Sequence, residues 1–91
     1  MDTVIAGAKY YDRDRDVILI PHYTGEYSMV DCTEYATKED LKGRYDKDFI
    51  KNNEENYIEH NGEIYYYAEW GPFSIGGWEL LSDISDLLLI N

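Results

Sequence analysis

The apolar residues in the first third of the chain fall in short runs that predict β-strands. Thr3–Tyr11 mixes β-branched, small and aromatic residues, and Val17–Ile20 is an apolar run closed by a proline. The polar residues 12–16 between them suit a hairpin connection. Glu26–Asp31 follows a Thr-Gly turn and is the third predicted strand.

The middle of the chain predicts one amphipathic helix over Lys38–Lys51. Thr37 is a suitable N-cap, and two acids stand in the first turn, where they face the positive end of the helix dipole. Apolar side chains recur at i, i+4 and i+8: Leu41, Tyr45 and Phe49. Gly43 weakens this helix by about 1 kcal/mol relative to alanine.

Asn61-Gly62 is the clearest short-range pattern in the sequence. Its flanks, Tyr57–His60 and Glu63–Tyr67, predict a hairpin whose two-residue turn needs positive φ at both central positions. The second flank carries apolar or aromatic groups on both faces. That pattern is typical of a central strand, or of a strand whose outer face is used for binding.

The C-terminal segment predicts a further strand at Trp78–Leu81. Ser82-Asp83 would cap a short helix carrying Ile84, Leu87 and Leu88, whereas Leu87–Ile90 also suits an edge strand. The predicted fold class is α+β. We expect a small single domain over residues 1–91, in which an antiparallel sheet of four to five strands has one main helix packed on a face.

Composition and charge narrow the classes of function. The 91 residues include 19 Asp and Glu against 8 Lys and Arg, a net charge of −11. Direct binding to nucleic acid or to an anionic membrane is therefore not expected, because both need clustered basic residues. No apolar run is long enough to span a membrane, and the N-terminus does not resemble a signal peptide. The single cysteine, Cys32, has no second cysteine in the chain with which to form a disulfide, and this favours a cytoplasmic location. If the protein is encoded by a phage, the location we expect is the cytoplasm of the host cell.

The negative charge is concentrated in the second half of the chain. Lys51 is the last basic residue, and eight acids follow it. The first 51 residues are close to balanced. An excess of one sign over a segment indicates an interaction surface rather than a particular fold.

The alternating aspartates Asp12, Asp14 and Asp16 allow three interpretations. A calcium loop of the EF-hand type is disfavoured, because its sixth and twelfth positions would be Val17 and Tyr23 instead of glycine and glutamate. A solvated turn with internal charge pairs is the simplest interpretation. An extended strand would instead present regularly spaced acids, about 6.8 Å apart, to a basic groove.

Catalytic chemistry finds little support in the sequence. His22 and His60 lie far apart and, with Cys32, form no recognisable nucleophile or metal motif. Acids beside Cys32 would raise the pKa of its thiol. Adjacent carboxylates are expected by chance among 19 acids. We expect neither enzymatic activity nor a cofactor or metal, and a small hydrolase using these residues is the disfavoured alternative.

The ten tyrosines exceed what so small a core buries. Tyrosine is enriched at protein interfaces, and beside acids it suits contact with Arg and Lys. The predicted partner-binding residues are therefore acids and tyrosines: Asp12, Asp14, Asp16, Glu54, Glu55, Tyr57, Glu59, Glu63, Tyr65, Tyr67 and Glu69.

In size, acidity, Tyr and Asn content and strand-helix-hairpin layout, the chain resembles the small anti-CRISPR and anti-restriction inhibitors of phages and mobile elements. That class shares no motif. The resemblance implies an inhibitor that occupies the basic nucleic-acid channel of a defence protein.

The resulting hypothesis is a non-enzymatic inhibitor of a basic nuclease or other nucleic-acid-binding effector, acting partly by nucleic-acid mimicry. An immunity protein or antitoxin that neutralises a nuclease toxin is an alternative, as is a structural or adaptor domain. The sequence is also compatible with a homodimer.

Overall fold

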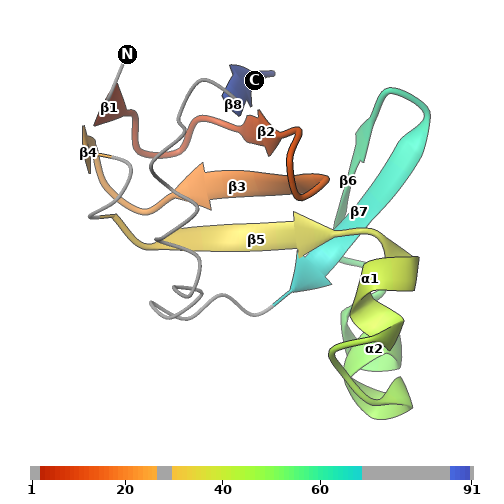
Figure 1. Cartoon of the computed structure of the whole chain (residues 1–91). Helices are drawn as coiled ribbons and strands as arrows, with labels where there is room; N and C mark the ends of the chain where they lie inside the picture. Colours follow the sequence, from red (N-terminus) through yellow and green to blue (C-terminus); the bar gives the residue numbers. More distant parts are fainter. Residues whose placement is uncertain (1–2, 27–29, 69–86, 91) are drawn as a thin grey trace.

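The short apolar runs pair into antiparallel sheets in the computed structural model, which describes residues 3–26, 30–68 and 87–90. The strands are β1 (Thr3–Val4), β2 (Tyr10–Asp12), β3 (Val17–Pro21), β4 (Gly25–Glu26), β5 (Cys32–Ala36), β6 (Tyr57–His60), β7 (Glu63–Ala68) and β8 (Leu87–Leu89). The helices are α1 (Lys38–Lys42) and α2 (Lys47–Asn53). Six strands form one sheet in the order β6-β7-β5-β3-β2-β8, and β1 pairs with β4 separately (Figure 1).

The predicted fold class is wrong in its layout. The large sheet has six antiparallel strands, not four to five, and two short helices replace the single main helix. The strand that was not predicted is β5, which lies inside the sheet between β7 and β3, next to the predicted third strand at Glu26–Asp31 in the sequence. At one edge of the sheet, β8 pairs with β2. This pairing confirms the edge-strand interpretation of the C-terminal leucines and shows that the alternative helix is wrong at Leu87 and Leu88. The predicted strand at Trp78–Leu81 and the cap at Ser82-Asp83 lie outside the described residues.

The predicted helix divides because a second N-cap lies inside it. Gly43 ends α1, and the Asp46 carboxylate then accepts a hydrogen bond from the Phe49 amide at 2.9 Å, which starts α2. Thr37 caps α1 as expected, accepting from the Asp40 amide at 3.2 Å. Asp46 competes with a continuous helix because aspartate binds nearby backbone amides in non-helical conformations.

The predicted strand Thr3–Tyr11 also divides. Gly7 has a φ of 80°, and the Ala8 amide donates to the Ile5 carbonyl, so a turn separates β1 from β2. The region predicted as a strand at Glu26–Asp31 contributes only Glu26 to β4, and 27–29 are not described.

The hairpin prediction is confirmed. Asn61 and Gly62 have φ values of 56° and 81°, and they join β6 to β7 with His60 opposite Glu63. β7 lies between β6 and β5, so it is an internal strand of the sheet. Its apolar residues on both faces follow from that position.

Both faces of the curled sheet carry apolar clusters. The larger cluster includes Leu41 of α1, which joins this helix to the sheet. The smaller one joins Ile18, Tyr35 and Tyr65 on the opposite face. The β6–β7 hairpin stands at an angle to the strands β2, β3 and β5 (Figure 1). Its His60 ring lies 4.9 Å from the Tyr11 ring of β2, a contact between segments far apart in the sheet order.

An ion pair between a buried glutamate and a partly exposed arginine attaches the segment between the helices to the sheet. Glu34 of β5 is 4% exposed, and its two carboxylate oxygens accept hydrogen bonds of 3.0 and 3.1 Å from Arg44. Arg44 also donates to Asp40 at 3.1 Å. Burial lowers the pKa of Arg44, but the hydrogen bonds and charge of Glu34 and the charge of Asp40 outweigh that effect and raise it. The break between α1 and α2 therefore places a cation against the sheet.

Candidate functional site

The turn between β2 and β3 uses its first aspartate internally. Asp12 is 6% exposed. Its Oδ1 accepts from the amides of Asp14 and Arg15, at 3.0 and 3.3 Å, and its Oδ2 accepts from Arg15 Nε at 2.9 Å. The solvated-turn interpretation is confirmed for this segment, and no extended row of acids forms. Asp14 alone of the three carries an exposed side chain without such a bond.

Asp16 joins this turn to the hairpin. Its φ is 57°, and its Oδ1 accepts hydrogen bonds from Tyr11 Oη at 2.8 Å and Tyr65 Oη at 2.7 Å. Burial, followed by the hydrogen bond to Asp16, raises the pKa of both tyrosines. Tyr65 is 3% exposed, so its ring belongs to the core. These residues have a structural role, and we do not include them in the site.

Tyr67 also points towards the body of the protein. Its ring lies 6.2 Å from the Tyr35 ring and 6.4 Å from the Phe49 ring of α2. The Tyr35 hydroxyl in turn donates to Asn56 Oδ1 at 2.9 Å. This aromatic contact holds the hairpin against α2.

The remaining predicted residues gather at α2 and the hairpin. Glu54 and Glu55 are exposed after α2, and Glu63 is exposed at the start of β7. Tyr57, which is 54% exposed, and Glu59 lie on the outer side of β6. Glu69 lies outside the described residues.

The outer side of the hairpin is the candidate site. We call it the hairpin face and define it by Tyr57, Glu59, Ile64 and Tyr66. The register places Tyr57 opposite Tyr66 and Glu59 opposite Ile64, so the four side chains share one side. Ile64 is 40% exposed. Tyr66 is half-buried, with Lys38 Nζ 5.3 Å from its ring centre.

The backbone of β6 adds to this face. His60 and Glu63 close the two-residue turn, so they form a hydrogen-bonded pair, and the pairs then alternate along the hairpin. The Tyr67 amide donates to the Asn56 carbonyl at 2.9 Å, in agreement with that alternation. Tyr57 and Glu59 therefore direct their N–H and C=O groups away from β7. Within the described residues, β6 has no strand on that side.

Ile64 and Tyr66 were missed as site residues by the sequence reasoning. Tyr57 and Glu59 were predicted as site residues because they are a tyrosine and an acid, a criterion that does not select an isoleucine. The hairpin register would have found the other two, because the Asn61-Gly62 turn fixes which residues lie opposite each other.

Other candidate chemistry is not assembled by the fold. His22 Nε2 lies 2.7 Å from Thr33 Oγ1, and the His60 ring packs on Tyr11. In the described ranges, no three His, Cys, Asp or Glu side chains are grouped to hold a metal ion. Nor does any helix in these ranges have the length and apolar character to cross a membrane.

Cys32 is expected to resist thiol reagents in the folded protein. It is 1% exposed, and burial, followed by the charge of Asp31, raises the pKa of its thiol to about 12. Because the thiolate is the reactive form, labelling with an aromatic disulfide at pH 8 should be at least tenfold slower than in urea. Equal rates in buffer and in urea would contradict the buried environment.

Comparison with protein-family models, with curated proteins and with solved structures finds no match for this chain.

Proposed function

We propose that this chain is a non-enzymatic inhibitor that binds a basic nucleic-acid-binding protein and covers the surface on which that partner holds nucleic acid. Anti-CRISPR and anti-restriction proteins act in this general way. The observation that supports the proposal best is the edge of β6, which has no partner strand among the described residues. Its outward backbone groups accompany an exposed tyrosine and an exposed glutamate.

An extended segment of the partner would add a strand beside β6. Backbone hydrogen bonds to Tyr57 and Glu59 would supply affinity, as in other cases of strand addition. The Glu59 carboxylate would accept hydrogen bonds from an arginine of that segment, and the Tyr57 ring would contact a cation. Ile64, which is exposed on the same side of the hairpin as Tyr57 and Glu59, offers an apolar contact to the bound segment. This chemistry selects a basic partner.

The charge of the whole chain supports the same partner class. A net charge of −11 attracts a basic protein over long range and repels nucleic acid, which leaves the partner's basic surface as the target. Such steering accelerates association and is screened by salt, since the Debye length is about 8 Å at physiological ionic strength.

Glu59→Arg tests the proposal directly. Affinity capture from host-cell lysate should recover a nucleic-acid-binding protein with the wild-type chain, and that protein's own DNA or RNA should compete for it. The substitution should weaken binding to this partner by about tenfold or more, because it places two cations together. Glu26→Arg is the matched control, since Glu26 is exposed on β4, outside the six-stranded sheet, and carries the same charge change.

The outcomes separate the hypotheses. A partner that nucleic acid does not displace contradicts the inhibitory mode, and equal weakening by both variants contradicts the assignment of the hairpin face. A captured nuclease toxin encoded beside this chain would indicate the immunity role instead. A virion or scaffold component would indicate the structural role.

A further inference from the structure

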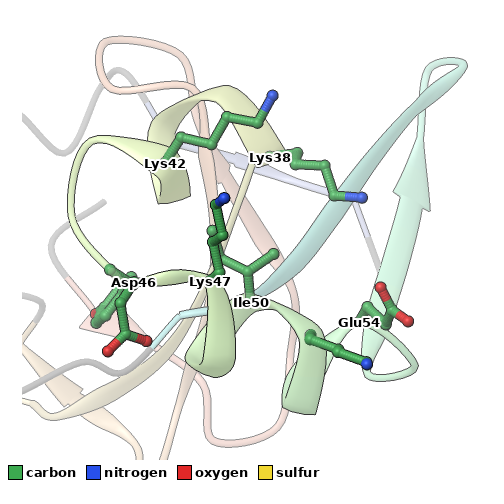
Figure 2. A pocket seen from close by; sticks show the side chains of 8 residues that line it. Lys38, Lys42, Asp46, Lys47, Ile50 and Glu54 are labelled. Carbon is green, nitrogen blue, oxygen red and sulfur yellow. The ribbon is translucent and has the colours of Figure 1, made fainter.

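A hollow of about 830 Å³ lies between the two helices, and its lining is basic despite the acidity of the chain (Figure 2). It holds half of the eight Lys and Arg residues of the sequence. The lining residues are Lys38, Lys42, Tyr45, Asp46, Lys47, Ile50, Lys51 and Glu54. Although the chain as a whole is negatively charged, the surface of this hollow is therefore positively charged.

The spacing of these lysines concentrates their charge. Lys38 and Lys42 are four residues apart on α1, and Lys47 and Lys51 are four residues apart on α2. Residues at this spacing share one side of a helix, and like charges there repel by a few tenths of a kcal/mol. Each helix thus contributes two lysines to the lining of the same hollow.

Nearby acids leave this charge largely uncompensated. Within the described residues, the ion pairs use Arg15 and Arg44, and no acid lies within 4.0 Å of these four ammonium groups. The Asp46 carboxylate caps α2 by accepting from the Phe49 amide, and it points away from the labelled lysines in Figure 2. Asp46 and Glu54 are the two acids of the lining, against four lysines. Lys38 has its additional contact with the Tyr66 ring.

The hollow also has apolar surface. Ile50 lies among the labelled lysines in Figure 2, and the methylene stems of these lysines add further carbon surface. Tyr45 contributes an aromatic ring. The volume falls within the range of roughly 300 to 1,000 Å³ that is typical of small-molecule sites. Cations around an apolar floor suit a ligand that has several negative charges and an apolar or aromatic body.

We propose that the hollow between α1 and α2 binds a small ligand that carries a polyphosphate group on an aromatic body, as a nucleoside triphosphate does. Lysine ammonium groups bind phosphate oxygens as point charges. Four of them match the charge of a triphosphate, which is close to −4 at neutral pH. The aromatic body would lie against Ile50 and Tyr45. This site adjoins the hairpin face, because Lys38 also contacts the Tyr66 ring, but it does not depend on the proposed inhibitory function.

The acidity of the rest of the chain reduces this affinity but does not abolish it. Distant carboxylates are screened beyond about 8 Å at physiological ionic strength, whereas the four lysines act at contact distance. Binding should consequently weaken as salt increases, because the ligand contacts are themselves charged.

Calorimetric titration of the whole chain with ATP and with tripolyphosphate tests the proposal. At low salt both probes should bind, with ATP the tighter of the two. Lys47→Gln combined with Lys51→Gln should weaken both by at least tenfold. Lys9→Gln, which removes a cation outside the hollow, should change neither by more than about twofold.

A second variant separates the apolar floor from the charge. Ile50→Ala should weaken ATP several-fold and leave tripolyphosphate unchanged, with urea unfolding used to confirm that the variant is folded. The proposal is overturned if ATP does not bind below 1 mM, or if the double lysine variant binds as the wild type does. It is also overturned if a poly-glutamate peptide binds more tightly than ATP, because that result assigns the hollow to an acidic peptide.

Discussion

Replacing Arg44 with methionine is expected to lower the free energy of unfolding by about 3 kcal/mol, because it leaves the Glu34 carboxylate unpaired in the core. Glu34 is 4% exposed and accepts both of its short hydrogen bonds from this guanidinium. Methionine preserves much of the apolar stem. Urea unfolding followed by far-ultraviolet circular dichroism measures the change.

Two further variants separate charge from packing at this pair. Lys42→Met removes an exposed cation that has no ion pair within the described residues, and it should change stability by no more than about 0.5 kcal/mol. Glu34→Leu combined with Arg44→Met should recover part of the loss, since no unpaired charge remains. If the double variant were less stable than Arg44→Met alone, the charge explanation would fail.

Asp16→Ala is expected to cost about 3 kcal/mol through two effects. It removes the acceptor of the Tyr11 and Tyr65 hydroxyls, where a hydrogen bond to a charged group contributes about 1.5 to 3 kcal/mol. It also places alanine at a φ of 57°, which glycine and asparagine tolerate better. Asp16→Asn keeps an acceptor and the backbone conformation, so its cost should be about 1 kcal/mol. Asp14→Ala, in the same turn but exposed, is the control and should be nearly neutral.

The same contact makes stability depend on alkaline pH. The folded protein raises the pKa of Tyr11 and Tyr65 above the ordinary value of 10.0, so both favour folding while they remain protonated. Their contribution is complete below pH 10 and is lost as the pH rises above it. Asp16→Asn should lose less stability between pH 8 and pH 11, because the repelling carboxylate is absent. Equal losses in both proteins, measured by urea unfolding, would show that these tyrosines are not responsible.

Elements that depend on neighbouring residues were predicted well from the sequence. The hairpin at Asn61-Gly62 was found because two adjacent residues must both adopt positive φ, and few residue pairs do so readily. The cap at Thr37 was found for a similar reason. Asp46 is also a residue type that caps helices, but the apolar stripe through Tyr45 and Phe49 favoured one continuous helix in the sequence-based prediction. These two rings do stack, with centres 4.0 Å apart, but Tyr45 lies in the break between the helices and Phe49 lies in α2.

The candidate site was predicted only in part, because residue type does not reveal which side chains the core uses. Asp12, Asp16 and Tyr65 were chosen as acids and tyrosines of a surface, yet hydrogen bonds from partners as far as 49 residues away occupy Asp16. Tyr57 and Glu59 remained at the surface because side chains alternate along β6, and Ile58, on the other side of this strand, is the one that packs on the smaller apolar cluster.

The sequence by itself determined the net charge and the turn at Asn61-Gly62, because these depend on composition and on contacts between near neighbours. The tertiary structure decided which acids face the solvent, where the edges of the sheet lie and that four lysines line one hollow. Lysines of α1 and α2 line one hollow because the helix breaks between Gly43 and Asp46, so that two helices border the same space. Strand order and side-chain burial arise from contacts between distant segments, which the free energy of the whole fold selects and no local pattern specifies.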